Sequence, residues 1–508
     1  MSSWDTYETS GAAAPQPSSE VTIGHTLQGR TDSYSVLEWL GEGCFGRVAK
    51  CHAVDQDRIV AVKLLKEQQF KDMEHEVSHV CQMKLEAQSV HDGAAQCPRP
   101  QPHKHRVCFL ERFEVMGLHC LAFEMLEVDL FSFMSNRDWV PLQLNEIRPI
   151  AHQLLVALDA LKGLGIVHTD IKPDNIMFSD LEEHPLKVKL IDFGEARKVS
   201  QVQLGATLQP CGSRAPEVTL GLPYTEAIDV WGVGCILAFL YLAENLFPVT
   251  CEYQAVKRLV TLLGMPPDHL LEAGLYSNNF FTQVQSSNSA AWRLLTAEEY
   301  AAKYKTTTEE EHSYFEVPSC LDGLVCNPPE NSTAKVEDRK AFLDLLKGLL
   351  NMFGDQRLTP SQALQHNYIT MGHLQKAELQ GYFMISEELM SICPSVDSSL
   401  SPLKEDQTSV SDATAESQTD APKSDTSTGQ DSGWESQSQL IMMVKKVSVQ
   451  TALVLIVEET EGFDGAAEED VSENEDQICE NPGSESEFEE KGDRRVKISQ
   501  QSQEQEHP

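Results

Sequence analysis

The sequence predicts an α+β fold, with β-strands near the N-terminus and helices further along. Two stretches of β-forming residues, 34–40 and 47–53, flank a glycine-rich run, and an alternating apolar stretch at 60–63 follows as a third strand. The longest apolar run, 230–243, is bounded by acidic residues and is too short to span a bilayer, so it predicts a buried helix. An apolar share of 41% is enough to build a core.

Composition separates this folded part from the two ends of the chain. Residues 1–33 are rich in Ser, Thr, Ala and Pro, and we expect them to be disordered. Residues 394–508 carry 27 Asp and Glu against 8 Lys and Arg, which is about half of the net charge of −38. Such a segment cannot bury enough apolar surface to offset the entropy cost of ordering it. We therefore expect an acidic disordered tail at 395–508, preceded by an extension at 370–394.

The net charge of −38 also restricts the class of partner and the compartment. It argues against direct binding of nucleic acid or of an anionic membrane surface, because both favour Lys and Arg. The 13 cysteines are scattered without paired metal-ligand spacing, and no basic and apolar leader begins the chain. We expect a reduced, intracellular protein that is not secreted.

The run from His168 to Asn175 reads His-Thr-Asp-Ile-Lys-Pro-Asp-Asn and places three functional groups on one short loop. Asp170 is a carboxylate that can orient an acceptor hydroxyl, and Lys172 is a cation that can face a transferred phosphate. Asn175 supplies an oxygen ligand for a metal ion. A polar surface turn is the ordinary alternative for such a run. The spacing of the three groups favours phosphoryl transfer.

A glycine-rich run lies upstream, where Gly41, Gly43, Gly46 and Val48 form Gly-x-Gly-x-x-Gly-x-Val. Glycines allow the backbone to approach phosphates closely and to donate N–H groups to them. Taken alone, the run is equally compatible with phosphate binding and with an ordinary hairpin turn. Lys63 ends the strand Val-Ala-Val-Lys that follows. After such a loop, it is predicted to bind phosphate rather than to be a solvated strand end.

Two carboxylates are predicted to complete this site. Glu76 lies in a helix-like segment, 73–87, and would hold Lys63 in place. Glu74 is its rival, but Glu76 comes directly before the apolar face of the helix. Downstream, a short apolar strand leads into Asp192 of an Asp-Phe-Gly run, whose carboxylate would bind a magnesium ion that bridges nucleotide phosphates.

With these motifs in this order, the sequence resembles the eukaryotic protein kinases. The resemblance extends over 34–369 and also includes Ala215-Pro216-Glu217, Asp229-Val230-Trp231-Gly232-Val233-Gly234 and Arg357. It implies a bilobal protein kinase fold. In that fold a small β-rich N-lobe would span about 34–126, and a larger α-helical C-lobe would span about 127–369.

Closer detail resembles one branch of that family. The branch is the homeodomain-interacting protein kinases of the CMGC group, which are relatives of the dual-specificity tyrosine-regulated kinases. The similar stretches are 34–41, 123–127, the alanine-rich helix before His168, and 221–229. The segment 280–335 resembles the insert that is characteristic of the CMGC group.

The resemblance implies ATP and Mg²⁺ as cofactors and gives each motif residue a role. Asp170 and Lys172 would be catalytic, and Asn175 and Asp192 would bind the metal. Phe123 takes the gatekeeper position before the hinge. The residues that would contact ATP are Leu40, Gly41, Gly43, Gly46, Val48, Ala61, Lys63, Glu76, Glu124 and Leu126. Structural roles are implied for His168, Phe193, Asp229 and the ion pair of Glu217 with Arg357.

The sequence departs from the family pattern in two places. Thr169 stands where many kinases carry the arginine that receives an activation-loop phosphate, which predicts less dependence on such a phosphate. Where the family reads Tyr-Leu-Gln-Ser-Arg-Tyr-Tyr-Arg, this chain reads Thr207-Leu208-Gln209-Pro210-Cys211-Gly212-Ser213-Arg214. Tyrosine autoactivation at Thr207 is therefore impossible. Arg214, which the group links to a preference for proline after the acceptor, is kept, but Gly212 and Ser213 replace the tyrosine pair that shapes this site.

One apolar run interrupts the acidic tail. Ala452-Leu453-Val454-Leu455-Ile456-Val457 is followed at once by Glu458-Glu459-Thr460-Glu461. A short β-prone run with an acidic flank resembles a motif that binds the small ubiquitin-like modifier SUMO by adding a strand to its sheet. The family resemblance implies such a motif after the kinase domain. SUMO or sumoylated proteins are therefore expected partners of 452–461. A segment that folds back on the kinase domain and an incidental apolar patch are the alternatives.

The sequence as a whole predicts an ATP-dependent protein kinase. It would transfer the γ-phosphate of ATP to Ser and Thr hydroxyls of protein substrates, among them transcription regulators in nuclear signalling. The altered activation segment motivates an alternative, a catalytically weak kinase-like scaffold. Intact Lys63, Asp170, Asn175 and Asp192 argue against the scaffold. A SUMO-dependent adaptor whose kinase activity is incidental is the third hypothesis.

Overall fold

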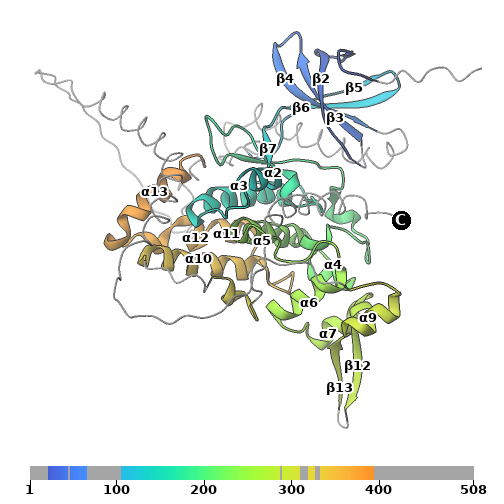
Figure 1. Cartoon of the computed structure of the whole chain (residues 1–508), viewed down its shortest axis with the longest axis vertical. Coiled ribbons are helices and arrows are strands. Elements are labelled where there is room, and N and C mark those ends of the chain that lie inside the picture. The colour runs from blue at the N-terminus through green and yellow to red at the C-terminus, as the bar shows by residue number, and fades with distance from the viewer. Residues whose placement is uncertain are drawn as a thin grey trace, which may run out of the picture. The chain divides into compact units, whose positions relative to one another are not determined.

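The computed structural model of the chain describes residues 21–43, 46–65, 105–286, 289–308, 318–325 and 332–393. Its N-lobe is built on an antiparallel six-stranded sheet in the order β1-β2-β3-β4-β6-β5 (Figure 1). The strands are β1 (Thr26–Gln28), β2 (Ser33–Gly43), β3 (Gly46–Ala53), β4 (Arg58–Leu65), β5 (Phe109–Val115) and β6 (Leu118–Glu124). The three strands predicted from the sequence are confirmed as β2, β3 and β4.

The folded part begins before the predicted boundary. Val21 and Leu27 are buried in the core of the N-lobe, and β1 pairs with β2. The buried carboxylate of Glu111 in β5 accepts the backbone N–H of Arg30 at 2.9 Å and so holds the turn between these two strands. The prediction of disorder up to residue 33 is therefore wrong from Val21 onward, because two apolar side chains and a buried acceptor anchor a segment of polar composition. The part before Val21 lies outside the described residues.

The C-lobe is organised around two long helices, α3 (Leu144–Gly163) and α5 (Ala227–Leu242), which pack against each other (Figure 1). α5 is the helix predicted from the apolar run, and it is buried on nearly all sides, as a central helix must be. Further helices are α2 (Leu130–Asn136), α4 (Pro216–Leu220), α6 (Glu252–Leu263), α7 (Asp268–Ala273), α8 (Ser277–Phe280), α10 (Thr333–Leu349), α11 (Pro360–Leu364) and α12 (Asn367–Thr370). No helix in the described part of the chain combines the length and the apolar character needed to cross a bilayer.

Short strands of the C-lobe carry the loops of the site. In one small sheet, β9 (Ile176–Phe178) lies between β10 (Val188–Leu190) and β7 (Val128–Asp129). In the other, β8 (Ile166–Val167) pairs with β11 (Arg197–Lys198). The run from His168 to Asn175 connects β8 to β9, and Asp192 follows β10 by two residues. The two sheets therefore bring these two segments of the sequence together.

The predicted insert contains an antiparallel hairpin of β12 (Phe281–Ser286) and β13 (Ser289–Leu294), followed by α9 (Ala297–Tyr304) (Figure 1). Thr296 and Glu299 cap the start of α9 reciprocally: each backbone N–H donates to the side chain of the other residue. Phe280 and Phe281 are buried in a separate apolar cluster with residues of α6 and α7. That this segment is the insert of the CMGC group stays a prediction.

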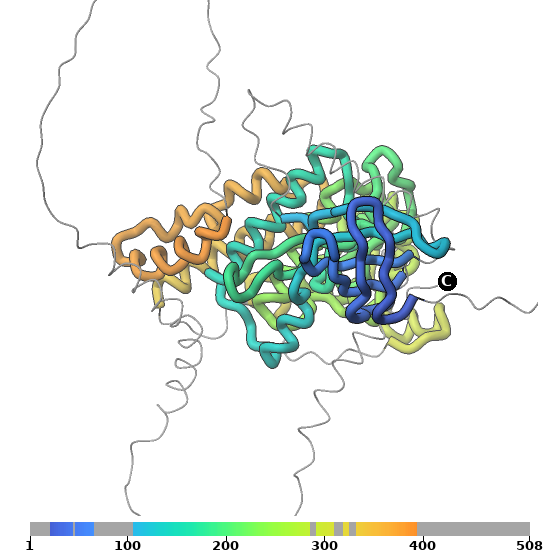
Figure 2. Tube along the Cα trace, turned by 90° about the horizontal axis from the view of Figure 1, so that it is seen from above, coloured from blue at the N-terminus to red at the C-terminus, as the bar shows by residue number. Residues whose placement is uncertain are grey.

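The extension predicted at 370–394 includes α13 (Gln380–Met390), which packs on α3 (Figures 1 and 2). The hydroxyl of Tyr382 in α13 donates to the carboxylate of Asp338 in α10 at 2.8 Å. Asp338 also forms an ion pair with Arg148 of α3, and neither of these two side chains is exposed at all. His373 approaches the same carboxylate at 2.8 Å. The extension up to residue 393 is therefore part of the folded C-lobe.

Candidate active site

Asp170 and Asn175 lie at opposite ends of the predicted catalytic loop and are joined by hydrogen bonds. The amide nitrogen of Asn175 donates to the carboxylate of Asp170 at 2.7 Å and to its backbone carbonyl at 2.9 Å. The Nζ of Lys172 lies 3.2 Å from the same carboxylate. The side chains of Asp170 and Lys172 keep 17% and 27% of their surface exposed, so they reach solvent from a mostly buried loop. The structure thus brings together the three groups predicted from the loop.

Asp229 of α5 fixes the backbone of this loop. Its carboxylate accepts the N–H of His168 at 2.6 Å and the N–H of Thr169 at 2.9 Å. Thr169 has a φ of +68°, a left-handed conformation that residues other than glycine rarely adopt, so the two bonds hold a strained loop. Burial raises the pKa of the Asp229 carboxyl, and the neighbouring His168 and the two N–H donors act in the opposite direction. The predicted structural role of Asp229 is confirmed.

Lys63 reaches across from β4 to the Asp-Phe-Gly run. Its Nζ donates to the carboxylate of Asp192 at 2.8 Å. Burial raises the pKa of the Asp192 carboxyl, but the Lys63 ammonium and its hydrogen bond lower it more, and the net shift is downward. Phe193 is buried and packs edge-on against the ring of His168, with 4.9 Å between the ring centroids. Glu76, the predicted partner of Lys63, lies outside the described residues.

The two predicted metal ligands lie on adjacent loops. The N–H of Ile191 donates to the backbone carbonyl of Asn175 at 3.0 Å, which places Asp192 beside the catalytic loop. Both side chains offer oxygen ligands, the type that Mg²⁺ prefers. Within the described ranges, no group of three or more His, Cys, Asp or Glu side chains is arranged to hold a metal ion. The pair therefore fits a divalent cation that takes most of its ligands from phosphate and water.

The glycine-rich run forms the turn between β2 and β3, where Gly43 faces Gly46 across the hairpin. A Cβ at Gly46 would lie 2.1 Å from the carbonyl oxygen of Leu64, so only glycine fits there. At Gly41 and Gly43, no described atom lies within 4 Å of the position that a Cβ would take. Among the described residues, nothing therefore crowds the backbone at these two glycines, which is compatible with a loop that covers phosphates.

The predicted hinge follows β6. Phe123 pairs with Ala61 of β4, and Leu126 is buried. The carboxylate of Glu124 accepts from the Nζ of Lys189 at 2.6 Å, so its side chain is engaged by β10 and a nucleotide base would meet its backbone groups. Of the other predicted ATP contacts, Leu40 is exposed and Val48 and Ala61 are half-buried.

The activation segment, 192–217, is held to the C-lobe by contacts that sequence reasoning missed. The hydroxyl of Thr169 donates to the carbonyl of Glu195 at 2.8 Å, so the residue in the place of the usual arginine holds the segment itself. The side chain of Gln209 donates to the carbonyl of Ile228 at 3.0 Å and accepts the N–H of Ala215 at 3.0 Å. The residue types give no signal for these contacts, because threonine and glutamine are common in any polar loop. Only the positions of Thr169 and Gln209 within the family motifs could have indicated them.

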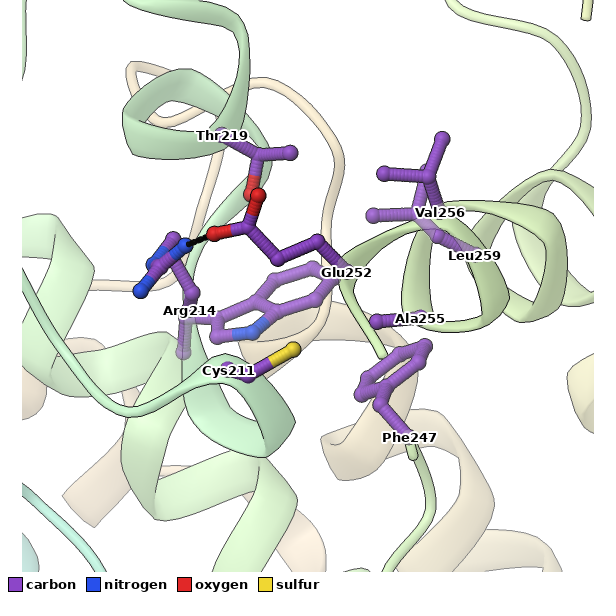
Figure 3. Close-up of a pocket in the computed structure, with 9 residues that line it drawn as sticks. Cys211, Arg214, Thr219, Phe247, Glu252, Ala255, Val256 and Leu259 are labelled. Carbon is purple, nitrogen blue, oxygen red and sulfur yellow. Dashed lines mark hydrogen bonds and ion pairs between the residues drawn. The ribbon is translucent and has the colours of Figure 1, made fainter. Parts of the chain in front are cut away.

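Arg214 orients the backbone just before it in the chain. Its guanidinium donates to the carbonyls of Leu208 and Gln209, each at 3.0 Å, and forms an ion pair with Glu252 at the start of α6 (Figure 3). Gln209 has a φ of +65°, so its carbonyl is turned onto Arg214. The retained arginine therefore sets the direction of a peptide group in the activation segment.

A small pocket lies beside this ion pair (Figure 3). Its walls are Cys211, Arg214, Thr219, Trp231, Phe247, Glu252, Ala255, Val256 and Leu259. The indole N–H of Trp231 is buried and has no hydrogen-bond acceptor within the described part of the chain. A water molecule in this pocket would satisfy it.

The packing around Gly212 explains why this chain has no tyrosine at position 212, where the family pattern has one. A Cβ at this position would lie 2.5 Å from Cγ1 of Val249 and 3.1 Å from the carbonyl oxygen of Phe247. The turn at 211–213 thus lies directly against the connection between α5 and α6. A tyrosine at position 212 does not fit this arrangement.

Glu217 and Arg357 form the predicted ion pair. Two parallel contacts of 2.7 Å and 3.0 Å join the carboxylate to the guanidinium, and the Arg357 side chain is fully buried. The guanidinium also lies 5.3 Å from the centroid of the Trp231 ring in α5. This bidentate pair anchors the end of the activation segment to the core of the C-lobe.

Comparison with known proteins agrees with this geometry. Residues 34–369 match the protein kinase domain. The chain is 37% identical over 350 residues to homeodomain-interacting protein kinase 2 of Mesocricetus auratus, a match that covers 68% of this chain and 29% of that protein. It is 36% identical over 369 residues to homeodomain-interacting protein kinase 1 of Mus musculus, with 72% and 29% covered. Against homeodomain-interacting protein kinase 4 of Homo sapiens, it is 34% identical over 374 residues, with 71% and 59% covered.

The matched part of the chain spans less than a third of the first two relatives and less than two thirds of the third. The family model covers the glycine-rich loop, Lys63, the catalytic loop, Asp192 and Arg357. The predicted resemblance to homeodomain-interacting protein kinases and the predicted bilobal fold are therefore confirmed. The chain belongs to the protein kinase family.

Proposed function

We propose that this protein is an ATP-dependent serine/threonine protein kinase that uses Mg²⁺. The observation that carries the proposal is the convergence of Asp170, Lys172 and Asn175 with Asp192 and Lys63. The five side chains come from three separate segments of the sequence and supply the carboxylate, cations and oxygen ligands that phosphoryl transfer needs. The family match over 34–369 supports the same reaction.

The roles of the residues follow from their contacts. Asp170 accepts or orients the proton of the substrate hydroxyl, and its hydrogen bond from Asn175 fixes the carboxylate for that task. Lys172 lies beside this carboxylate and stabilises charge on the transferred phosphate. Lys63 would bind the α- and β-phosphates of ATP. Asn175 and Asp192 would hold a magnesium ion, which would neutralise charge on the phosphates when bound.

The substrate class is inferred from the names of the relatives and from the charge of this chain. The relatives are named for their interaction with homeodomain proteins, and that name describes the relatives. For this chain, we infer protein substrates that include transcription regulators, and a site of action in the nucleus and/or the cytoplasm. The acidic composition, with a net charge of −38, favours substrates that carry basic residues near the acceptor.

Incorporation of phosphate from Mg-ATP into a basic protein substrate tests the proposal. We expect transfer by the wild type and background transfer by Asp170→Ala. Asp180→Ala is the matched control, because Asp180 is an exposed aspartate of the same lobe whose hydrogen bonds are to its own turn. Equal, background incorporation by the wild type and Asp170→Ala would leave the kinase-like scaffold as the better reading.

Binding of SUMO through 452–461 is a separate proposal, and this segment lies outside the described residues. The apolar run with its acidic flank supports it, because such a run can add a strand to a partner's sheet edge. Purified SUMO should bind the full chain, and replacing Leu453 to Val457 by alanine should abolish that binding without changing kinase activity. Unchanged binding by the alanine variant would contradict the proposal, and loss of cellular localisation in this variant would support the adaptor hypothesis.

A further inference from the structure

A hydroxyl from the turn between α7 and α8 reaches the activation segment at Gly205. The Oη of Tyr276 donates to the carbonyl oxygen of Gly205 at 2.5 Å. Gly205 has a φ of +79°, a conformation that favours glycine. A Cβ at this position would stand 3.0 Å from the same Oη and 3.1 Å from Cδ1 of Leu275. The backbone of the activation segment therefore passes close against the turn that carries Tyr276.

Tyr276 is itself held at its backbone and at its ring. Its N–H donates to the carbonyl of Leu220, the last residue of α4, at 2.9 Å. A Cβ at Gly221 would lie 2.7 Å from Cδ2 of the ring, so the ring occupies space that only a glycine leaves free. Because the ring is also half-buried, the hydroxyl is held in place rather than free to rotate through solvent.

The stretch that Tyr276 contacts lies between two parts of the activation segment that are anchored by other elements. Before it, β11 pairs with β8, and after it, Gln209 and Arg214 fix the backbone. At the start of the stretch 199–206, the N–H of Val199 donates to the carbonyl of Gly165 at 2.9 Å, and two further backbone hydrogen bonds are local turns of 3.3 Å and 3.2 Å. The hydrogen bond from Tyr276 ties the later part of this stretch to the body of the C-lobe.

We propose that Tyr276 is a positioning residue that holds the activation segment in its substrate-binding conformation without a phosphate. The chain has Thr169 in place of the usual phosphate-binding arginine and Thr207 in place of the tyrosine. Tyr276 supplies a neutral hydrogen bond to a backbone carbonyl, and dephosphorylation does not remove it. The inference rests on the proposed kinase function, since the conformation matters only for a substrate that is phosphorylated.

The test compares Tyr276→Phe with the wild type in the full chain, after treatment with a phosphatase that acts on Ser, Thr and Tyr. Intact mass confirms that no phosphate remains. Loss of one hydroxyl should raise the KM for a peptide substrate about fivefold and leave the KM for ATP and the melting temperature unchanged. Tyr253→Phe is the matched control: its hydroxyl donates to the carbonyl of Leu295 at 2.8 Å, in the insert. It should change neither KM.

A second pair of variants tests the same contact from the other side. Gly205→Ala places a methyl group against Tyr276, and Gly117→Ala imposes similar backbone strain, at φ +77°, in the turn between β5 and β6, where nothing described lies within 4 Å. Gly205→Ala should raise the KM for the peptide, whereas Gly117→Ala should lower stability only.

The outcomes separate the inference from the proposed function. An unchanged KM for the peptide in Tyr276→Phe overturns the inference and leaves the kinase function standing. Equal increases in both KM values together with a lower melting temperature also overturn it, because they indicate a merely structural role. A dephosphorylated wild type that is inactive, when the phosphorylated form is active, shows that phosphate is required and overturns it as well. Inactivity of both forms refutes the proposed function and, with it, the inference.

Discussion

Arg148 in α3 and Asp338 in α10, 190 residues apart in the sequence, form an ion pair with no exposed surface on either side chain. His373 and Tyr382 contact the same carboxylate at 2.8 Å each. A buried carboxylate is tolerated only when its oxygens are paired, and here three donors share the task. This cluster connects α3 and α10 to the C-terminal extension.

The pH dependence of stability follows from the Asp338 carboxyl. Burial raises its pKa, but His373, Arg148 and Tyr382 lower it more, and the net shift is below the usual value. A carboxyl with a lowered pKa stabilises the folded state above its unfolded pKa, about 4, and this contribution is lost as the pH falls through the folded pKa. The gap in unfolding free energy between the wild type and Asp338→Asn should shrink as the pH falls below about pH 4.

Urea unfolding at several pH values measures this gap. Asp322→Asn is a suitable control, because Asp322 pairs with Lys347 while 56% and 43% of the two side chains are exposed. Its variant should differ little from the wild type at any pH. A gap for Asp338→Asn that stays constant down to pH 3 would contradict the inference that the folded protein lowers the pKa of the Asp338 carboxyl.

Removing one partner of the Glu217–Arg357 pair should strongly lower the free energy of unfolding. Arg357→Ala leaves the carboxylate of Glu217 buried and uncompensated, with an expected loss of about 3–5 kcal/mol in the free energy of unfolding. Arg293→Ala breaks the exposed pair with Glu299 and should cost much less, because solvent screens exposed ion pairs. Chemical denaturation of both variants checks the contrast. Similar losses in the two variants would show that burial of the Glu217–Arg357 pair is not what matters.

Asp229→Asn should slow the reaction without blocking ATP binding. The asparagine side chain offers one acceptor oxygen, so the N–H of His168 or of Thr169 is left without its partner. An unsatisfied buried N–H costs about 1–3 kcal/mol, and displacement of the strained loop should lower kcat by about tenfold or more. Steady-state kinetics measures the loss in kcat, and a nucleotide-binding measurement shows whether ATP affinity is kept. An unchanged kcat in a folded variant would show that Asp229 is not needed to hold the catalytic loop.

Gly212→Tyr restores the residue of the family pattern and should nevertheless be harmful. Its Cβ would meet Cγ1 of Val249 at 2.5 Å, so either the turn at 211–213 or the connection after α5 must move. We expect a lower melting temperature and a higher KM for peptide substrates. Combining it with Val249→Ala removes the nearest atom and should restore part of both losses. A single variant as stable as the wild type would show that the backbone adapts freely at this turn.

The chemistry of the site was predictable from the sequence because its groups act in short runs. Asp170, Lys172 and Asn175 share one loop, and their spacing alone indicates their roles. The strands around Gly41 and Lys63 follow from alternation of apolar residues, which is a local signal. These predictions needed no knowledge of which distant residues meet.

The contacts between distant elements were not predictable from one sequence. Thr169 holding the carbonyl of Glu195, and Tyr276 holding that of Gly205, involve backbone acceptors that every residue type provides. The order of the segment that begins at Val21 was missed for a related reason, since its composition is polar and its burial depends on Glu111 in another strand. Composition describes the average of a segment, whereas anchoring depends on a few side chains and their partners.

The cluster around Asp338 also decides where a recombinant kinase domain should end. The family match ends at residue 369, but His373 and Tyr382 lie beyond it and serve a carboxylate inside it. Leu374 and Leu379, also beyond the match, are buried. A protein shortened to the family boundary would keep every catalytic group and lose two of the donors to a buried charge. A recombinant fragment that ends at residue 393 should be soluble and stable where one that ends at 369 precipitates.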